Sequence, residues 1–280
     1  MVEYPIVKLQ GQVMGELVAG PDTATTGVVV LGGSSGRVDV DRAKLFAEAG
    51  ARAFALQWFG GYGQSPGICE IPLETFFQAT DYLISTGCQR IVFVGTSKGA
   101  EAALLVTAFD PRVSAVVAVS PSSVVWGNIG PGQDGIAWPE RSSWCLDGVP
   151  LDFVPADPAW KPEYRDDLIS YRGLFEHCLT RFEEAARRAQ IPVERVSAEI
   201  VLVAGGDDAL WPSDLFAQQL LKRGKENGKS VSLVYDAEAG HRILFPGEKT
   251  PRSTLRAHGG GDEADARLGH VAWQKILPLL

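Results

Sequence analysis

The chain has 280 residues, of which 45% are hydrophobic and 21% charged, and its formal net charge at pH 7 is −8. This composition indicates a globular protein, and the acidic balance argues against a nucleic-acid partner because phosphate binding requires a clustered basic face. No apolar run reaches the roughly 18 residues that span a bilayer, and the first ten residues lack the basic and apolar segments of a signal peptide, so we expect a cytoplasmic protein without a membrane partner.

The cysteines and histidines show none of the spacings that metal sites require. The four cysteines follow no CxxC pattern, and the four histidines form no HExxH motif. The sequence therefore predicts reduced thiols, no bound metal and no organic cofactor.

Two short β-like stretches between Ile6 and Val18 predict a hairpin at one edge of a sheet. Apolar strands then alternate with helices. The predicted strands are Gly27 to Leu31, Ala51 to Gln57, Arg90 to Val94, Val113 to Val119, Glu199 to Ala204 and Val231 to Tyr235. Five helices are predicted: one that begins near Val40, three at Leu73 to Ser85, Glu101 to Phe109 and Ser213 to Lys225, and a last one after Asp262. In the last helix, one apolar stripe contains Ala264, Leu268, Val271, Ala272 and Ile276. Strands that are apolar almost throughout, joined by helices, predict an α/β fold with a mostly parallel sheet covered on both faces.

This alternation stops between Ser120 and about Leu168, where tryptophans lie among Gly, Pro and Ser residues. A helix from about Tyr171 to Gln190 is predicted to close this segment. A long irregular insertion in a compact domain is usually functional. We therefore expect a single domain over residues 1–280, with a lid insertion at about 120–190, after the strand that ends near Val119.

The strongest chemical motif is the GxSxG sequence from Gly95 to Gly99, directly after a predicted strand and directly before a predicted helix. A sharp turn in this position forces strained backbone angles on Ser97, so small residues are needed two positions to either side. The turn lifts the Ser97 hydroxyl above the strand ends and directs the N–H of Lys98 toward a developing oxyanion. We therefore predict that Ser97 is a nucleophile.

A serine nucleophile needs a base that a carboxylate holds in the correct tautomer. Candidates for both follow the next strands: Asp207 and Asp208 come after the strand that ends at Ala204, and His241 comes after the strand that ends at Tyr235. The order Ser, Asp, His is that of α/β-hydrolases, and all of these residues follow the carboxyl ends of strands, where such sheets bind ligands. His258, in a Gly-rich loop, follows no strand and has a weaker claim.

The Gly-rich loop after the first buried strand is the expected source of a second oxyanion donor. We predict the N–H of Ser34 for this role, with Gly33 shaping the turn. The spacing GGSSG does not match the GxGxxG motif of dinucleotide binding. Aromatic residues next to the predicted site loops could line an acyl pocket or belong to the core, and they are Trp58, Phe59, Trp126 and Trp211.

Several segments resemble, in order, the C-terminal catalytic domain of the acyl-CoA thioesterase and bile-acid-CoA:amino acid N-acyltransferase family, which is itself similar to dienelactone hydrolases. The segments are VLGGSSG, IPLETF, GTSKGAEAAL, SSWCLDGVPLDFVP and LVAGGDDALWPS. The resemblance implies an α/β-hydrolase fold and a triad of Ser97, Asp208 and His241. Asp208 is favoured over Asp207 because the family places its acid four residues before a proline, here Pro212.

The sequence departs from this family in two respects. Animal members carry a β-sandwich domain before the catalytic domain, whereas only about 25 residues precede the first buried strand here. The acyltransferase branch and the dienelactone hydrolases typically have a cysteine nucleophile, whereas position 97 is serine. This difference favours hydrolysis, because a serine acyl-enzyme is more commonly resolved by water.

The sequence therefore predicts a serine hydrolase that cleaves a small-molecule acyl thioester or carboxylic ester through an acyl-enzyme, similar to acyl-CoA thioesterases. The alternatives are an acyltransferase, a lactone or ester hydrolase in a biosynthetic pathway, and a non-catalytic ligand-binding protein. Coenzyme A phosphates would require local positive charge. Side chains that could supply this charge, or could equally be ordinary solvated charges, are Lys98, Arg141, Lys161, Arg165 and Arg172.

Overall fold

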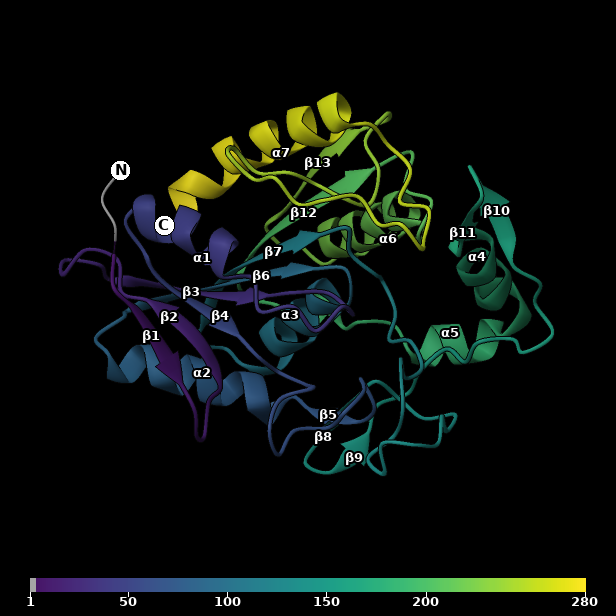
Figure 1. Cartoon of the computed structure of the whole chain (residues 1–280), viewed down its shortest axis with the longest axis horizontal. Coiled ribbons are helices and arrows are strands. Elements are labelled where there is room, and N and C mark those ends of the chain that lie inside the picture. Colours follow the sequence, from purple (N-terminus) through teal and green to yellow (C-terminus); the bar gives the residue numbers. More distant parts are fainter. Residues whose placement is uncertain (1–3) are drawn as a thin grey trace.

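The computed structural model describes residues 4–280 and is built around an eight-stranded sheet (Figure 1). Its strand order is β1-β2-β4-β3-β6-β7-β12-β13. These strands are β1 (Ile6–Leu9), β2 (Gly15–Val18), β3 (Thr26–Leu31), β4 (Arg52–Leu56), β6 (Arg90–Thr96), β7 (Val113–Val119), β12 (Glu199–Gly205) and β13 (Val231–Asp236). The β1–β2 hairpin pairs antiparallel with β4, and all other neighbours are parallel. The prediction of a mostly parallel sheet with a hairpin at one edge is confirmed.

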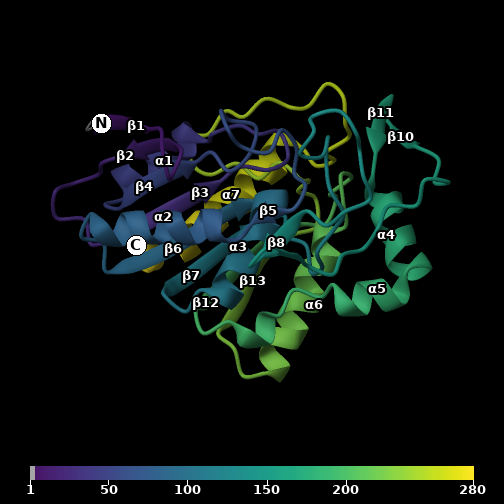
Figure 2. The ribbon, with the colours of Figure 1, turned by 90° about the horizontal axis from the view of Figure 1, so that it is seen from below.

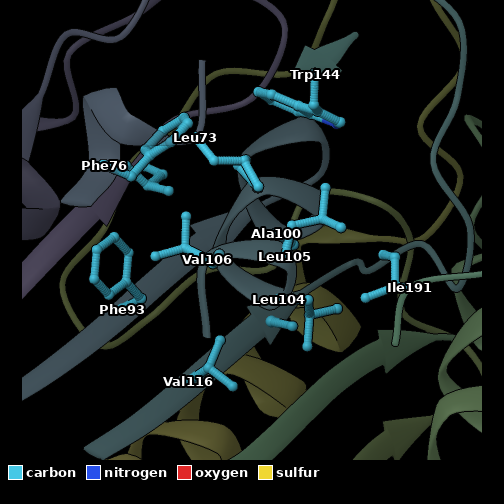
Figure 3. Packing of buried hydrophobic residues seen from close by; sticks show 14 of the residues in the cluster. Leu73, Phe76, Phe93, Ala100, Leu104, Leu105, Val106, Val116, Trp144 and Ile191 are labelled. Atoms are coloured by element: carbon cyan, nitrogen blue, oxygen red, sulfur yellow. The ribbon is translucent and has the colours of Figure 1, made fainter. Parts of the chain in front are cut away.

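Helices cover both faces of this sheet, which buries its apolar strands on both sides. One face packs against α1 (Val40–Glu48) and α7 (Asp262–Ile276), and Figure 1 shows both on the upper side of the sheet. The other face packs against α2 (Glu74–Ser85), α3 (Lys98–Phe109) and α6 (Ser213–Glu226). Figure 3 shows part of this second core, where Phe76, Val106 and Phe93 pack together. Among residues 4–280, no helix is long and apolar enough to cross a membrane.

The insertion after β7 contains short strands and two helices rather than one. First, β8 (Trp144–Leu146) and β9 (Val149–Pro150) form a small sheet with β5 (Ile71–Pro72). Next comes the antiparallel hairpin of β10 (Glu163–Arg165) and β11 (Leu168–Ser170). The helices α4 (Arg172–Arg181) and α5 (Glu183–Arg188) and the 3-10 turn η1 (Val193–Arg195) follow. Figures 1 and 2 both place β10, β11 and α4 beyond the same end of the main sheet.

The prediction of one helix from Tyr171 to Gln190 is wrong at Phe182. The backbone there has φ −118° and ψ 47°, which is outside the helical region and separates α4 from α5. The break lets the following segment turn back, so that the Ala189 carbonyl accepts a 2.8 Å hydrogen bond from the Val125 N–H. Tertiary pairing therefore overrides the local helical pattern.

The predicted stripe of α7 is wrong at one position. Val271 is half exposed, whereas Asp265 and Gly269 face inward. Gly269 packs against the backbone of Leu244, and glycine is required there because a Cβ would lie 1.7 Å from the Leu244 carbonyl oxygen. Asp265 is buried because its carboxylate accepts a 2.8 Å hydrogen bond from the Gly240 N–H. A short 3-10 turn, η2 (Leu277–Leu279), follows the helix.

A buried ion pair joins α1 to the loops around the sheet's carboxyl end. Arg42 makes two 2.7 Å hydrogen bonds to the Glu248 carboxylate, and the side chains of the pair are 5% and 6% exposed. The same guanidinium donates to the Thr96 hydroxyl at 2.6 Å and to the Ile243 carbonyl at 3.2 Å. Arg42 therefore fixes the end of β6 relative to the loop that follows His241.

We expect the Glu248→Gln substitution to lower the free energy of unfolding by about 3–5 kcal/mol, because it leaves a buried arginine without its counter-charge. Urea denaturation followed by circular dichroism would measure the change. The exposed pair Lys222–Glu226, 4.0 Å apart, provides the control, and Glu226→Gln should cost at most about 0.5 kcal/mol. Equal stability of the Glu248→Gln variant and the wild type would contradict this assignment.

Candidate active site

The turn at Ser97 has the backbone geometry that the sequence predicts. Ser97 has φ 57° and ψ −121°, in a region that L-amino acids rarely adopt, and α3 begins at the next residue. A Cβ at Gly95 would lie 2.1 Å from the Gly99 carbonyl oxygen, and a Cβ at Gly99 would lie 2.4 Å from the Gly32 carbonyl oxygen. Glycine is therefore required at both positions for the turn to close against β3.

The Lys98 side chain points into the core. Its ammonium makes two 2.8 Å hydrogen bonds to the Glu101 carboxylate, and both side chains are at most 1% exposed. Burial lowers the pKa of Lys98, and the Glu101 charge opposes this effect. The Glu101 carboxylate also accepts hydrogen bonds from the Trp144 indole at 2.7 Å and the Trp126 N–H at 3.0 Å. The backbone N–H of Lys98 belongs to the first turn of α3, where N–H groups lack a partner within the helix.

The structure brings Asp208 and His241 together and separates Asp207 from them. The Nδ1 atom of His241 lies 2.8 Å from Oδ2 of Asp208, and both residues are buried. Asp208 is held in place because its carboxylate accepts hydrogen bonds from the Ser213 hydroxyl at 2.6 Å and from the N–H groups of Leu210 and Trp211 at 2.9 and 3.2 Å.

Asp207 has a different environment. Its carboxylate forms a bidentate ion pair with Arg165 at 2.7 and 2.8 Å and accepts the Gly260 N–H at 2.9 Å. The hydrogen bonds from Arg165 hold the pKa of Asp207 below its usual value. Asp207 is therefore engaged with the insertion and not with His241.

The end of β7 links the turn at Ser97 to the His241 loop. The Ser97 N–H donates to the Val119 carbonyl at 2.9 Å, and the next residue, Ser120, donates its hydroxyl to the His241 carbonyl at 3.0 Å. The Trp211 indole N–H donates to the Ser120 carbonyl at 3.1 Å. Within residues 4–280 the Ser97 hydroxyl makes no hydrogen bond, and Ser97 remains 8% exposed. The backbones of the predicted nucleophile and base are thus joined through two consecutive residues, Val119 and Ser120.

The Gly-rich loop after β3 lies against the nucleophile. A Cβ at Gly33 would lie 3.2 Å from the Ser97 Cβ and 3.8 Å from the Ser97 Oγ. Ser34, the predicted oxyanion donor, is the next residue and is half-buried. The Gly-rich loop and the turn at Ser97 are therefore in close contact at Gly33.

The aromatic residues predicted near the site occupy two environments. The Trp211 ring lies edge-on to His241 with centroids 5.9 Å apart, and the Phe59 ring lies beside Gly36 of the Gly-rich loop. Trp58 packs in the core against Phe76 and Trp144, and it also lines a groove of about 440 Å³.

Trp126 is likewise buried in a core contact. It packs against Phe175 of α4 and Phe216 of α6, and its indole N–H donates to the Ser122 hydroxyl at 2.9 Å. Trp211 therefore lies next to His241 and Phe59 lies next to the Gly-rich loop, whereas Trp58 and Trp126 pack against other aromatic residues of the core.

The cations considered for phosphate binding are mostly paired with carboxylates. Lys98 is buried against Glu101, and this burial excludes it from contact with a ligand. The other pairs are Arg141 with Glu70, Arg165 with Asp207, and Arg172 with Glu176 and Asp214. Lys161 is exposed. The structure thus contradicts the interpretation of Lys98 as a phosphate ligand.

His258 lies beside His241, although its position in the sequence made it a weak candidate for the site. Its ring centroid lies 5.5 Å from that of His241, and its carbonyl accepts the N–H of His241 at 2.8 Å and that of Ala209 at 3.3 Å. The Gly run after it allows this approach, since a Cβ at Gly259 would lie 1.7 Å from the Asp207 carbonyl oxygen. The sequence HGGG at residues 258–261 indicates a backbone that can approach other segments closely, but only the tertiary structure shows which loops it contacts.

Residues 71–280 match the family described as "BAAT / Acyl-CoA thioester hydrolase C terminal", which is three quarters of the chain. The fold and the turn at Ser97 define the class, an α/β-hydrolase. Within that class, the chain belongs to this BAAT and acyl-CoA thioester hydrolase family.

Two relatives and one solved structure illustrate the similarity. Acyl-coenzyme A thioesterase 6 of Mus musculus is 26% identical over 268 residues, covering 89% of this chain and 58% of the relative. Acyl-coenzyme A amino acid N-acyltransferase 1 of Mus musculus is 27% identical over 246 residues, covering 85% and 53%. A crystal structure of a putative dienelactone hydrolase from Klebsiella pneumoniae has the same fold, with a TM-score of 0.55, 13% identity and coverage of 95% and 92%. The chain spans about three fifths of the length of the thioesterases that it matches.

Burial lowers the pKa of His258 to about 4, the neighbouring His241, Arg242 and Arg252 also lower it, and Asp208 opposes them. In the unfolded chain this imidazole titrates near 6.5, so the unfolded state binds more protons between pH 6.5 and 4 and the folded state loses stability as the pH falls through this window. Replacing His258 with Asn should reduce that loss by about 1–2 kcal/mol, after allowance for partial solvent exposure.

Urea unfolding at a series of pH values between 4 and 7 would measure the effect. His270 is exposed on α7, and the His270→Asn variant should follow the wild-type curve. A His258→Asn variant with the wild-type pH dependence would contradict the assignment.

Proposed function

We propose that the chain is a serine hydrolase that cleaves an acyl thioester or carboxylic ester. Two features of the loops that follow the strands support this proposal. These are the strained turn that presents Ser97, and His241 with its Nδ1 2.8 Å from Asp208. Family membership supports the same reaction class, because the matching family is described by acyl-CoA thioester hydrolysis.

In the proposed reaction, the Ser97 hydroxyl oxygen attacks the acyl carbonyl carbon while His241 Nε2 accepts the hydroxyl proton. Asp208 accepts the Nδ1–H of His241, fixes its tautomer and stabilises the imidazolium that forms. The oxyanion accepts hydrogen bonds from the N–H groups of Lys98 and Ser34. When the intermediate collapses, the bond to the leaving thiol or alcohol breaks and His241 returns the proton to it. Water then attacks the acyl-enzyme by the same route, which releases the acid and restores Ser97.

The thioester of coenzyme A is the substrate that the relatives' names favour, since the matching thioesterases act on acyl-coenzyme A. The N-acyltransferase relative supports acyl transfer to an amine as a second candidate. The serine at position 97 favours water as the acceptor. Product analysis with an acyl-coenzyme A, in water alone and with added amino acids, would separate the two reactions.

The Ser97→Ala substitution should reduce turnover by at least about 10⁴-fold without loss of folding, because the nucleophile is removed and no buried contact is broken. Turnover would be measured on a panel of acyl-coenzyme A thioesters and p-nitrophenyl esters, with circular dichroism as the folding control. A variant that keeps more than half of the wild-type rate would rule out Ser97 as the nucleophile.

The two neighbouring aspartates provide a matched comparison. Asp208→Asn should lower kcat by about 10³–10⁴-fold, because an amide in place of the carboxylate cannot stabilise the imidazolium and favours the wrong tautomer. Asp207→Asn should lower kcat by less than about tenfold, because this residue contacts Arg165 and Gly260 instead of His241. The opposite ranking of the two variants would transfer the acid role to Asp207.

A further inference from the structure

The insertion contacts the loop that carries Asp208, residues 206–212 between β12 and α6, which we call the acid loop. Three consecutive residues of that loop each receive a side-chain hydrogen bond from the segment that includes β10, β11 and the first residue of α4. Arg165 donates to the Asp207 carboxylate at 2.7 Å, Arg172 donates to the Asp208 carbonyl at 3.1 Å, and the Ser170 hydroxyl donates to the Ala209 carbonyl at 2.7 Å. The Arg172 N–H also donates to the Ala209 carbonyl, at 3.3 Å.

The peptide group that follows Asp208 is held at both of its polar atoms. Its oxygen, the Asp208 carbonyl, accepts from Arg172, and its nitrogen, the Ala209 N–H, donates to the His258 carbonyl at 3.3 Å. The same His258 carbonyl accepts the N–H of His241. A continuous set of hydrogen bonds therefore runs from the insertion, through the peptide attached to Asp208, to the backbone of His241.

Carbonyl groups in an irregular loop lack the partners that a helix or sheet supplies, so their orientation depends on donors from elsewhere. The Asp208 carboxylate already receives four hydrogen bonds, counting His241, from its own loop, the first residue of α6 and the His241 loop. The backbone carbonyls of Asp208 and Ala209 receive their side-chain donors from the insertion instead.

Arg172 is well suited to hold this peptide. Its guanidinium forms ion pairs with Asp214 of α6 and Glu176 of α4, both at 2.9 Å, and its side chain is 28% exposed. The fixed fork of a guanidinium lets one side chain hold several acceptors in a set geometry, which a lysine ammonium on a flexible stem does less well. Arg172 thus joins the insertion, α6 and the acid loop.

We propose that the insertion contributes to the reaction by positioning the catalytic acid, with Arg172 as the main positioning residue and Ser170 as a second. This inference rests on the proposed function, because it assigns the acid role to Asp208. The insertion is then part of the catalytic apparatus. Loss of the Arg172 contact frees the 208–209 peptide to rotate, which disturbs the alignment of Asp208 and His241 and slows the attack by Ser97.

A fluorophosphonate probe tests the inference without knowledge of the substrate. The rate of covalent labelling at saturating probe, kinact, reports the activation of Ser97, and the probe concentration at half-maximal rate, KI, reports probe binding. We expect Arg172→Met to lower kinact by about tenfold or more, as for a lost hydrogen bond from a charged donor, with KI changed by less than about twofold. Arg172→Lys should restore part of the loss.

Glu176→Gln is the matched control, because it removes an ion-pair partner of the same guanidinium on the same helix and leaves the contact with Asp208. Its kinact should lie within about twofold of the wild-type value. A purely structural role for Arg172 would lower the melting temperature and the fraction of protein that is labelled while kinact stays unchanged. That result would overturn the inference.

If Arg172→Met does not fold, Ser170→Ala decides the question, because it removes one hydrogen bond from the acid loop and leaves the ion pairs in place. Its kinact should fall by about two- to fivefold, and a wild-type kinact would reject the inference. Wild-type protein that is not labelled at Ser97 would instead refute the proposed function, and the positioning role with it. Labelled wild type with unchanged Arg172 and Ser170 variants would refute the positioning role alone.

Discussion

The structure of the site depends on the close contact between the two glycines that flank Ser97. Because Gly95 packs on the Gly99 carbonyl, the chain turns from β6 into α3 within a few residues and holds Ser97 at φ 57°. Gly99 in turn lies against the carbonyls of Leu31 and Gly32, so the same contact sets the distance to the Gly-rich loop. A strained residue of this kind costs about 1–3 kcal/mol and persists only when its surroundings fix it, which the buried strands β3 and β6 do here.

Buried charges hold the loops around this turn. Glu101 joins Lys98 to the tryptophans of the insertion, Arg42 joins Glu248 to the end of β6, and Asp265 accepts the N–H of the residue before His241. Buried ion pairs add little net stability compared with apolar residues of the same size, but breaking one leaves an uncompensated charge. Their consequence here is geometric, because each pair allows one arrangement of the loops that it joins.

The insertion has two relations to the site. Two of its tryptophans, Trp126 and Trp144, donate hydrogen bonds to the buried Glu101 carboxylate. Its β10–β11 hairpin and α4 contact the loop that carries Asp208. Most cations at this end of the molecule are paired with carboxylates, so the positive charge that a coenzyme A phosphate would need is limited to exposed side chains such as Lys161.

Local sequence patterns were enough to predict the sheet, the helices on both of its faces and the turn at Ser97, because these depend on local apolar periodicity and on glycine at fixed positions. It also placed His241 and two candidate acids after the correct strands. The resemblance favoured Asp208 over Asp207, and the tertiary structure shows Asp208 hydrogen-bonded to His241 and Asp207 paired with Arg165. Only the tertiary structure broke the helix at Phe182 and brought His258 beside His241. Those features depend on contacts between segments far apart in the chain. The residues next to a carboxylate or carbonyl in the sequence do not indicate which distant donor will form a hydrogen bond with it.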